Sequence, residues 1–586
     1  MSNATDKAMK FLGEERAFRL GELLTESFHP KTLELSQIAR SDLVGAIRML
    51  QSVDEEIAPA MQKVFAQDVF AELVAALFRA IGQGKRIYFT GCGATGRLSI
   101  LLEAAWRRFW REHPDIAVKT GQMEDRTISV MAGGDFALIK SVEGFEDFPD
   151  FGRYQLRQAG VQVGDVVVAI TEGGETPFVI GTAWEGLDAG AEVFFVYNNP
   201  TDALRKHVRR SRQVIEEPRI KKLDLTTGPM AITGSTRMQA TTAELLVVGA
   251  ALEIALAQFL EEHLSEPGRA EAGLEARNGG DYHRLFVNLL SELCRPAAVE
   301  TMARVIEFEE NIYRRKGLVT YITDWALLDV LTDTTERSPT FMLPPFRRKD
   351  DSLSPRSWAF VKDPLRPTKA AWREMLQRRP RGLNWRNDVY EQLDAPAALK
   401  VNPPRLDNAE IYKFQIGNEP DDSRTDAPDS ALVVVDVGSQ TGDFAGSALK
   451  RLSAGYKRTA ALTIGPTGKY ETDEIFEFPC ELPSSPLRLW DHLAVKLILN
   501  TISTATMVRM DRVIGNAMVW LSPSNKKLID RGSRLISQQT GCTYDQACIE
   551  LHIAIEQVQS QQEQAKEPPS PVALAIERIN AKRHES

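Results

Sequence analysis

The order of strands and helices repeats itself along this 586-residue chain, and that repetition limits the folds open to it. Apolar runs at 85–91 and 166–171 each lead through a glycine-containing loop into a helical pattern. A third run follows at 192–200, and a long helical pattern covers 235–260. Strands that alternate with helices predict an α/β fold with a doubly wound, flavodoxin-like parallel sheet.

The same order returns in the second half of the chain. A strand and helix are expected at 317–336, a strand, loop and helix at 431–452, a strand and turn at 458–468, and a closing helix at 492–510. Tyr88 and Tyr321 are 233 residues apart, whereas Pro200 and Pro466 are 266 apart. The difference predicts a net insertion, which the Pro- and Arg-rich stretch 342–418 can supply. We therefore expect two fused copies of one domain.

Helical patterns flank the two copies. We expect a helical N-terminal segment at 1–60, a first domain at 61–270, a second, degenerate domain at 280–515 and a C-terminal helical cap at 516–586. The residues after 566 look weakly held, as chain ends often are. The basic runs FRRKDD and LQRRPRGLNWRN lie in the insertion with Trp358, Trp372 and Trp385, and we interpret them as a solvated loop, with a partner surface as the alternative.

Composition places the chain among ordinary globular proteins and argues against several functions. The formal net charge of −9 gives no global attraction to nucleic acid or anionic lipid. Five cysteines form no CxxC pair, no apolar run approaches a membrane span, and the charged start lacks the apolar core of a signal peptide. We expect a cytoplasmic protein with no nucleic-acid or membrane partner. No histidine pair suggests a metal site, and no cofactor is expected.

The most informative segment is the loop from Gly91 to Arg97, GCGATGR, between a strand and a helix. Glycines let the backbone approach an anion, and the helix N-terminus offers free N–H groups. The GxGxxG spacing also fits a dinucleotide site, but no acidic residue follows at the place where a ribose contact needs one. A tight turn without a ligand is the other interpretation.

Two further loops share this character. The segment 171–177, TEGGETP, also joins a strand to a helix, so it should face the same crevice as the first loop. The segment 233–237, TGSTR, precedes the long helix. Hydroxyl and N–H groups without a P-loop lysine suit a sugar phosphate better than a nucleoside triphosphate. Helix capping alone is the alternative explanation of both loops.

These segments resemble the SIS (sugar isomerase) domain family. The resemblance rests on GCGATGRLSIL, MAGGDFALIKSVEGFED, TEGGETPFVIG and TGSTRMQATTAE and covers roughly residues 20–560. More narrowly, the chain is similar to bacterial N-acetylmuramic acid 6-phosphate etherase. Its tandem layout is similar to that of the animal glucokinase regulatory protein.

The resemblance implies one composite site shared by the two halves. The phosphate would be held by the first two loops, although the family usually has serine at the position of Gly173. The etherases use two glutamates as acid and base. Glu146 matches the first of them, whereas Ala105 stands at the position of the second. In the second half, Glu336 lies in a stretch that is similar to the family's sequence around the second glutamate. The implied catalytic residues are Glu146 and Glu336, and the implied ligand-binding residues are Gly91, Gly93, Ala94, Thr95, Gly173, Gly174, Thr176, Ser235, Thr236, Arg237 and Lys527.

Two functions from different classes remain open at this point. The first is a regulator-like protein that binds a hexose or amino-sugar phosphate, with a sugar kinase as the partner that the resemblance would imply. The second is an etherase-like lyase or an isomerase that uses Glu146 and Glu336. A nucleotide-binding oxidoreductase is a third hypothesis, which rests on the GxGxxG spacing alone.

Overall fold

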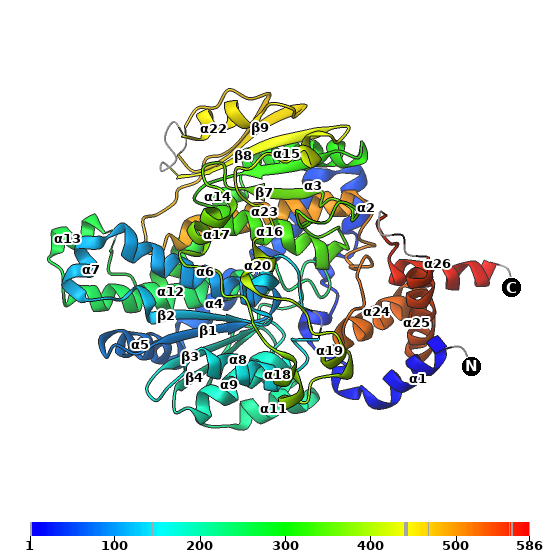
Figure 1. Ribbon diagram of the computed structural model, residues 1–586, viewed down its shortest axis with the longest axis horizontal. Coiled ribbons are helices and arrows are strands. Elements are labelled where there is room, and N and C mark those ends of the chain that lie inside the picture. Colours follow the sequence, from blue (N-terminus) through cyan, green and yellow to red (C-terminus); the bar gives the residue numbers. More distant parts are fainter. Residues whose placement is uncertain are drawn as a thin grey trace.

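Two five-stranded parallel sheets form the framework of the protein (Figure 1). The computed structural model describes residues 3–584 except 143, 273, 439–443, 467, 562, 564 and 565. The first sheet has the order β2-β1-β3-β4-β5 and the second the order β7-β6-β8-β9-β10. Numbered within each half, both orders are 2-1-3-4-5. The α/β duplication expected from the sequence is therefore confirmed.

Each sheet combines central strands that the sequence predicted with edge strands that it did not. The first sheet contains β1 (Ile87–Gly91), β2 (Thr127–Met131), β3 (Val166–Thr171), β4 (Glu192–Tyr197) and β5 (Ile220–Asp224). The second contains β6 (Leu318–Ile322), β7 (Ala359–Lys362), β8 (Ser430–Val437), β9 (Arg458–Ile464) and β10 (Glu474–Phe478). The sequence analysis did not predict β2, β5, β7 and β10, which are the edge strands of the two sheets.

Four long helices meet between the two sheets in the middle of the molecule (Figure 1). They are α6 (Gly93–Glu112), α12 (Gln239–Glu261), α16 (Leu327–Phe341) and α23 (Leu489–Arg509). α6 packs against α16, and α12 packs against α23, so each half pairs its helices with those of the other. α12 is long and apolar enough to cross a membrane by length and composition, but 89% of its apolar window is buried inside the fold.

The remaining helices surround this frame. The helices before β1 are α1 (Asn3–Glu14), α2 (Leu35–Ser41), α3 (Leu43–Asp54), α4 (Ile57–Phe65) and α5 (Asp68–Gly82). The first half adds α7 (Pro114–Thr120), α8 (Pro149–Gln158), α9 (Pro177–Asp188), α10 (Thr201–His207), α11 (Arg209–Glu216) and α13 (Glu266–Glu271). The second half adds α14 (Gly279–Leu293), α15 (Pro296–Arg314), α17 (Thr368–Leu376), α18 (Asn387–Gln392), α19 (Ala397–Val401), α20 (Asn408–Ile411), α21 (Asp422–Thr425) and α22 (Phe444–Leu452). Short 3-10 turns lie at Arg16–Phe18, Leu24–Glu26, Pro30–Thr32, Glu124–Arg126 and Gly134–Leu138.

The cap consists of α24 (Lys526–Thr540), α25 (Tyr544–Ser560) and α26 (Pro571–His584), and α1 from the opposite end of the chain packs against α25 (Figure 1). The expectation that the last residues are weakly held is wrong for α26. Val572 and Ala575 are fully buried, and the Ser570 hydroxyl donates to the Val519 carbonyl at 2.7 Å. Apolar contacts with α24 and α25 hold this helix in place.

The expectation of a solvated loop is confirmed for the run FRRKDD, which belongs to no helix or strand and has Arg348 and Lys349 exposed, but it is wrong for the rest of the insertion. It contains β7 and α17–α20, and Trp372 in α17 is fully buried. Arg378 in the basic run is only 8% exposed, because it pairs with acidic side chains of the first half. Basic residues of the insertion thus serve as internal ion-pair partners.

Candidate ligand-binding site

A cavity of about 240 Å³ lies at the carboxyl ends of the strands of the first sheet. The loops after β1 and β3 border it, which is where the 2-1-3-4-5 order reverses direction and where ligands bind in open α/β sheets. Elements of the second half and of the cap complete its wall. Of the residues suggested by the sequence, those that line it are Gly93, Ala94, Glu146, Thr176, Ser235, Thr236, Arg237, Glu336 and Lys527.

The first loop shapes the start of α6. The Thr95 hydroxyl donates to the Cys92 carbonyl at 2.8 Å and accepts from the Cys92 N–H at 3.0 Å, so it caps its own turn and does not line the cavity. A Cβ atom on Gly91 would lie 2.5 Å from the Thr95 carbonyl carbon, so only glycine fits there. Gly93, at a φ of +52°, and Ala94 bring the N-terminus of α6 to the cavity.

The second loop similarly prepares the start of α9. Gly174 has a φ of +68°, and a Cβ atom there would lie 2.5 Å from Leu204. The Gly173 carbonyl accepts from the Asn199 amide at 3.0 Å. Neither glycine lines the cavity, whereas Thr176, directly before α9, does. Two helix N-termini therefore end at one cavity, which is an arrangement suited to an anion.

Glu336 reaches this cavity from α16 of the second half. Its side chain is buried, and its Oε2 atom has no hydrogen-bond partner among the described residues; the nearest cation is Arg237, at 3.9 Å. Burial raises the pKa of Glu336 against the opposing effects of Arg97, Lys496 and Arg237. The Ser235 hydroxyl is likewise buried without a partner in the described part of the chain. Both atoms are covered by protein, so neither faces the cavity directly.

The cap supplies the outer wall of the cavity. The Asn525 side chain, at the N-terminus of α24, donates to the Glu146 carboxylate. Lys527 lies 3.6 Å from Glu175, and although burial would lower the pKa of Lys527, Glu146 and Glu175 raise it overall. Arg531 also lines the cavity and pairs with Glu26 of the N-terminal segment.

Several polar residues that line this cavity were not selected from the sequence, and the charged or amide-bearing ones among them are Arg97, Glu172, Asn525 and Arg531. Glu172 follows β3 directly, and burial together with Glu336 and Glu146 raises its pKa to about 7, against its own backbone hydrogen bond and Lys527. Glu172 and Arg97 stand inside the two loop motifs quoted above, so their position after a strand was a usable signal. Arg531 and Asn525 carry no such local signal.

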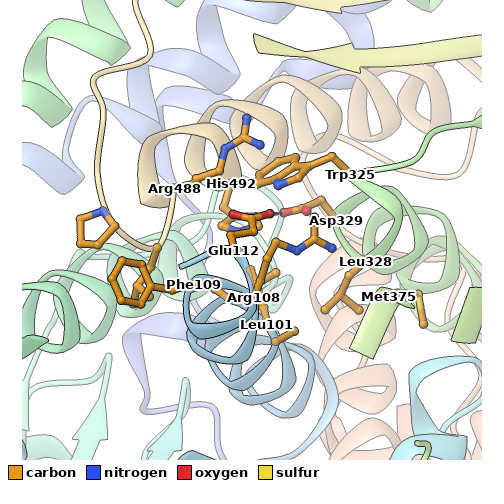
Figure 2. A pocket seen from close by; sticks show the side chains of 14 residues that line it. Leu101, Arg108, Phe109, Glu112, Trp325, Leu328, Asp329, Met375, Arg488 and His492 are labelled. Carbon is orange, nitrogen blue, oxygen red and sulfur yellow. Dashed lines mark hydrogen bonds and ion pairs between the residues drawn. The ribbon is translucent and has the colours of Figure 1, made fainter. Parts of the chain in front are cut away.

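An equivalent but much smaller cavity of about 20 Å³ lies between α6 of the first half and the starts of α16 and α23 of the second (Figure 2). We call it the closed cavity because side chains fill most of it. Figure 2 shows Trp325, from the turn after β6, under the guanidinium of Arg488, which lies 3.8 Å from the ring centroid. The His492 ring stacks on the Trp325 ring, with the two ring centroids 4.7 Å apart, and forms a hydrogen bond with Asp329 at 2.8 Å. The remaining space suffices for about one water molecule. Residues 439–443, which follow β8 in the chain, lie outside the described residues.

The pseudo-symmetry of the two halves makes Ala105 in α6 and Glu336 in α16 equivalent positions. β1 begins at Ile87 and β6 at Leu318, an offset of 231 residues, and the same offset separates Ala105 from Glu336. Because α6 and α16 cross, Ala105 lines the closed cavity, whereas Glu336 lines the open one. The alanine therefore removes a carboxylate from the closed cavity and leaves the open cavity unaffected.

Comparison with known proteins agrees with this geometry. The family model described as "Glucokinase regulatory protein N-terminal SIS domain" matches residues 69–185. N-acetylmuramic acid 6-phosphate etherase of Bacillus subtilis is 30% identical over 229 residues, which are 39% of this chain and 67% of the relative. N-acetylmuramic acid 6-phosphate etherase 2 of Vibrio parahaemolyticus is 32% identical over 232 residues, 39% of this chain and 68% of the relative. The solved structure of tagatose-6-phosphate ketose/aldose isomerase from Escherichia coli is 9% identical with a TM-score of 0.43, over 80% of this chain and 94% of that one.

The fold and the matches in sequence define a protein built from SIS-type domains. The chain belongs to the SIS domain family. The similar proteins include N-acetylmuramic acid 6-phosphate etherases. The present chain differs from a single domain in that two SIS-type halves are fused in it.

Proposed function

We propose that the protein binds one phosphorylated hexose or amino sugar per chain, in the open cavity. The observation that carries the proposal is the lining of this cavity, where two helix N-termini end beside Glu146, Glu336 and Lys527. The phosphate would accept hydrogen bonds from the backbone at Gly93 and Ala94 and from Thr176. A dianion there would also be attracted by Lys527 of the cap.

The sugar would lie between the two glutamates. Glu146 of the first half and Glu336 of the second would accept hydrogen bonds from its hydroxyl groups, with Ser235, Thr236 and Arg237 beside them. The turn residues Gly91, Thr95, Gly173 and Gly174 would act indirectly, by shaping the two loops. In this proposal the cavity needs no cofactor and no metal ion.

A regulatory role is our first interpretation of this binding. One of two equivalent cavities is filled by side chains, and the Asn525 amide occupies one oxygen of Glu146. Both features suit a site that senses a ligand and signals through its cap. The protein would then act in the cytoplasm, with a sugar kinase as the partner suggested by the match to the glucokinase regulatory protein domain. The boundaries 61–270 and 280–515 for the two SIS-type domains are part of the same proposal.

A lyase is the second candidate, and one observation favours it. The open cavity keeps both glutamates, and the raised pKa of Glu336 would let this carboxyl act as a proton donor while Glu146 accepts a proton. The similar proteins are named as etherases, which fits this chemistry.

The two roles can be separated in one experiment. The protein is mixed with N-acetylmuramic acid 6-phosphate, fructose 6-phosphate, fructose 1-phosphate and glucosamine 6-phosphate, and melting temperature and released lactate are measured. A regulator gives a rise in melting temperature without lactate. Lactate release that Glu336→Gln abolishes and Glu112→Gln, at the closed cavity, leaves intact would establish the lyase. No stabilisation by any sugar phosphate would contradict the binding proposal itself.

A further inference from the structure

We infer that Trp385, carried by a strap from the second half, positions the loop of Glu146 and so sets the affinity of the proposed site. The strap is the segment 377–406 of the insertion, and the site loop comprises residues 132–142 and 144–148 of the first half. The inference rests on the proposed function. Trp385 does not line the cavity, so it would act through the loop.

Buried ion pairs anchor the strap to the first half. The Arg381 guanidinium donates two hydrogen bonds, of 2.7 and 2.9 Å, to the Glu103 carboxylate of α6. Arg378 pairs with Glu103 at 3.0 Å and with Asp135 of the site loop at 2.5 Å. Backbone groups join the same two segments: the Arg381 N–H donates to the Asp135 carboxylate at 2.6 Å, and the Asp135 N–H donates to the Arg381 carbonyl at 3.1 Å. These contacts fix the beginning of the site loop.

Aromatic contacts fix the other end of the loop. The ring of Trp385 stacks on Phe145 at 5.5 Å with an interplanar angle of 23°, and its indole N–H donates to Gln158 of α8 at 2.8 Å. Tyr390 of the strap approaches Phe145 at 6.4 Å. Phe145 is fully buried and is the direct neighbour of Glu146. The indole therefore holds Phe145 in place, and the position of Phe145 determines where the backbone places the adjacent Glu146 side chain.

The Phe145 ring also packs on Phe151 of α8 at 4.9 Å, but the backbone of the loop near Glu146 has few hydrogen bonds of its own. Residues 144–148 belong to no helix or strand, and Gly144 has a φ of +80°. One backbone contact, from the Phe178 N–H to the Glu146 carbonyl at 3.0 Å, and the Asn525 side chain complete the hydrogen bonds recorded for Glu146. Removing the indole would loosen the packing of Phe145. Because the groups of a binding site must be held within about 0.5 Å of the productive geometry, we expect binding to weaken.

Trp358 offers a matched control within the same insertion. It is half-buried like Trp385, donates its indole N–H to Glu567 at 2.6 Å, and packs on Tyr313 at 5.3 Å. All these partners lie away from the open cavity. Trp385 packs on Phe145, Phe151, Tyr154 and Tyr390, whereas Trp358 packs on Tyr313. The unfolding free energy of each variant is therefore measured as well, and affinities are compared under conditions in which both variants are fully folded.

The test compares full-length Trp385→Ala, Trp385→Phe and Trp358→Ala by amide hydrogen exchange and by calorimetric titration with the sugar phosphates named above. We expect exchange in the peptide spanning 136–148 to become about tenfold faster in Trp385→Ala only. Affinity should fall about tenfold in that variant and recover in Trp385→Phe, which keeps the stacking. In a Glu146→Gln background the same tryptophan change should have little further effect, because coupled residues are not additive.

Each contrary result has a distinct meaning. Unchanged exchange in Trp385→Ala, or faster exchange with unchanged affinity, overturns the positioning role while the binding proposal stands. Equal losses of affinity in Trp385→Ala and Trp358→Ala also overturn it, because the effect would then be general. If the unaltered protein binds none of the sugar phosphates, the proposed function fails and this inference fails with it.

Discussion

Glu103 is the most heavily paired carboxylate at the contact between the two halves. It is fully buried and pairs with Arg107 of its own helix and with Arg378 and Arg381 of the strap. Burial alone would raise the pKa of Glu103, but the three arginines hold it well below its usual range. A carboxylate so placed stays ionised, and removing its charge would leave cations buried without compensation.

We predict that Glu103→Gln lowers the free energy of unfolding by about 3–5 kcal/mol, because a broken buried ion pair leaves unpaired charge behind. Chemical denaturation measures the change. Glu124→Gln removes a half-buried partner that lies 3.5 Å from the same Arg107, and this control should cost less than about 1 kcal/mol. Equal, small losses in both variants would show that the strap is not held by these charges.

Residues also mark the limits of prediction from sequence. The loops at 91–97, 171–177 and 233–237 could be found locally, because glycine and hydroxyl residues after buried strands have few other uses. The pairing of Arg378 with Glu103 could not, since nothing near either residue in the chain indicates a partner about 275 positions away. Glu336 was reached only through its resemblance to a family stretch, as its place in the first half's cavity depends on the crossing of α6 and α16.

At the scale of elements, α24 is the link between the cap and the open cavity. Its N-terminus carries Asn525 and Lys527, and further along Arg531 and Arg534 pair with Glu26 of the N-terminal segment at 2.5 and 2.6 Å. Although burial opposes ionisation, these two arginines lower the pKa of Glu26 to about 2. The ion pairs thus hold the cap over the site.

This pKa predicts acid sensitivity of the cap. The folded value lies below the unfolded value of 4.5, so the stabilisation is present above pH 4.5 and is lost as the pH falls toward 2. The difference corresponds to about 3 kcal/mol. Urea unfolding at pH 7 and pH 3 should show a smaller pH-dependent loss in Glu26→Gln than in the unaltered protein, and no such change in the exposed control Glu14→Gln. Parallel pH profiles for Glu26→Gln and the unaltered protein would contradict this assignment.

The strands and helices differ in how clearly the sequence predicts them. Central strands such as β3, buried along its whole length, appear as continuous apolar runs. The edge strand β5 mixes two lysines and an aspartate with its apolar residues, and β10 alternates exposed and buried positions, so neither has such a run. α26 was misjudged because its helix follows a proline-rich stretch, whereas its burial depends on the surface offered by α24 and α25.

At the scale of the whole molecule, the duplication places two equivalent cavities in one chain and keeps only one open. Trp325, Arg488 and His492 fill the second, and the second half contributes Glu336 to the first. A fused pair can lose one site in this way, whereas a symmetric homodimer changes both sites together. The central claim is therefore that two halves and a cap form a single ligand site.

Calorimetric titration with the tightest-binding sugar phosphate tests this claim most directly. We predict one ligand per chain, with binding lost or weakened at least about tenfold by both Glu146→Gln in the first half and Glu336→Gln in the second, and unchanged by Glu112→Gln at the closed cavity. Two ligands per chain, or full affinity in Glu336→Gln, would contradict the composite site.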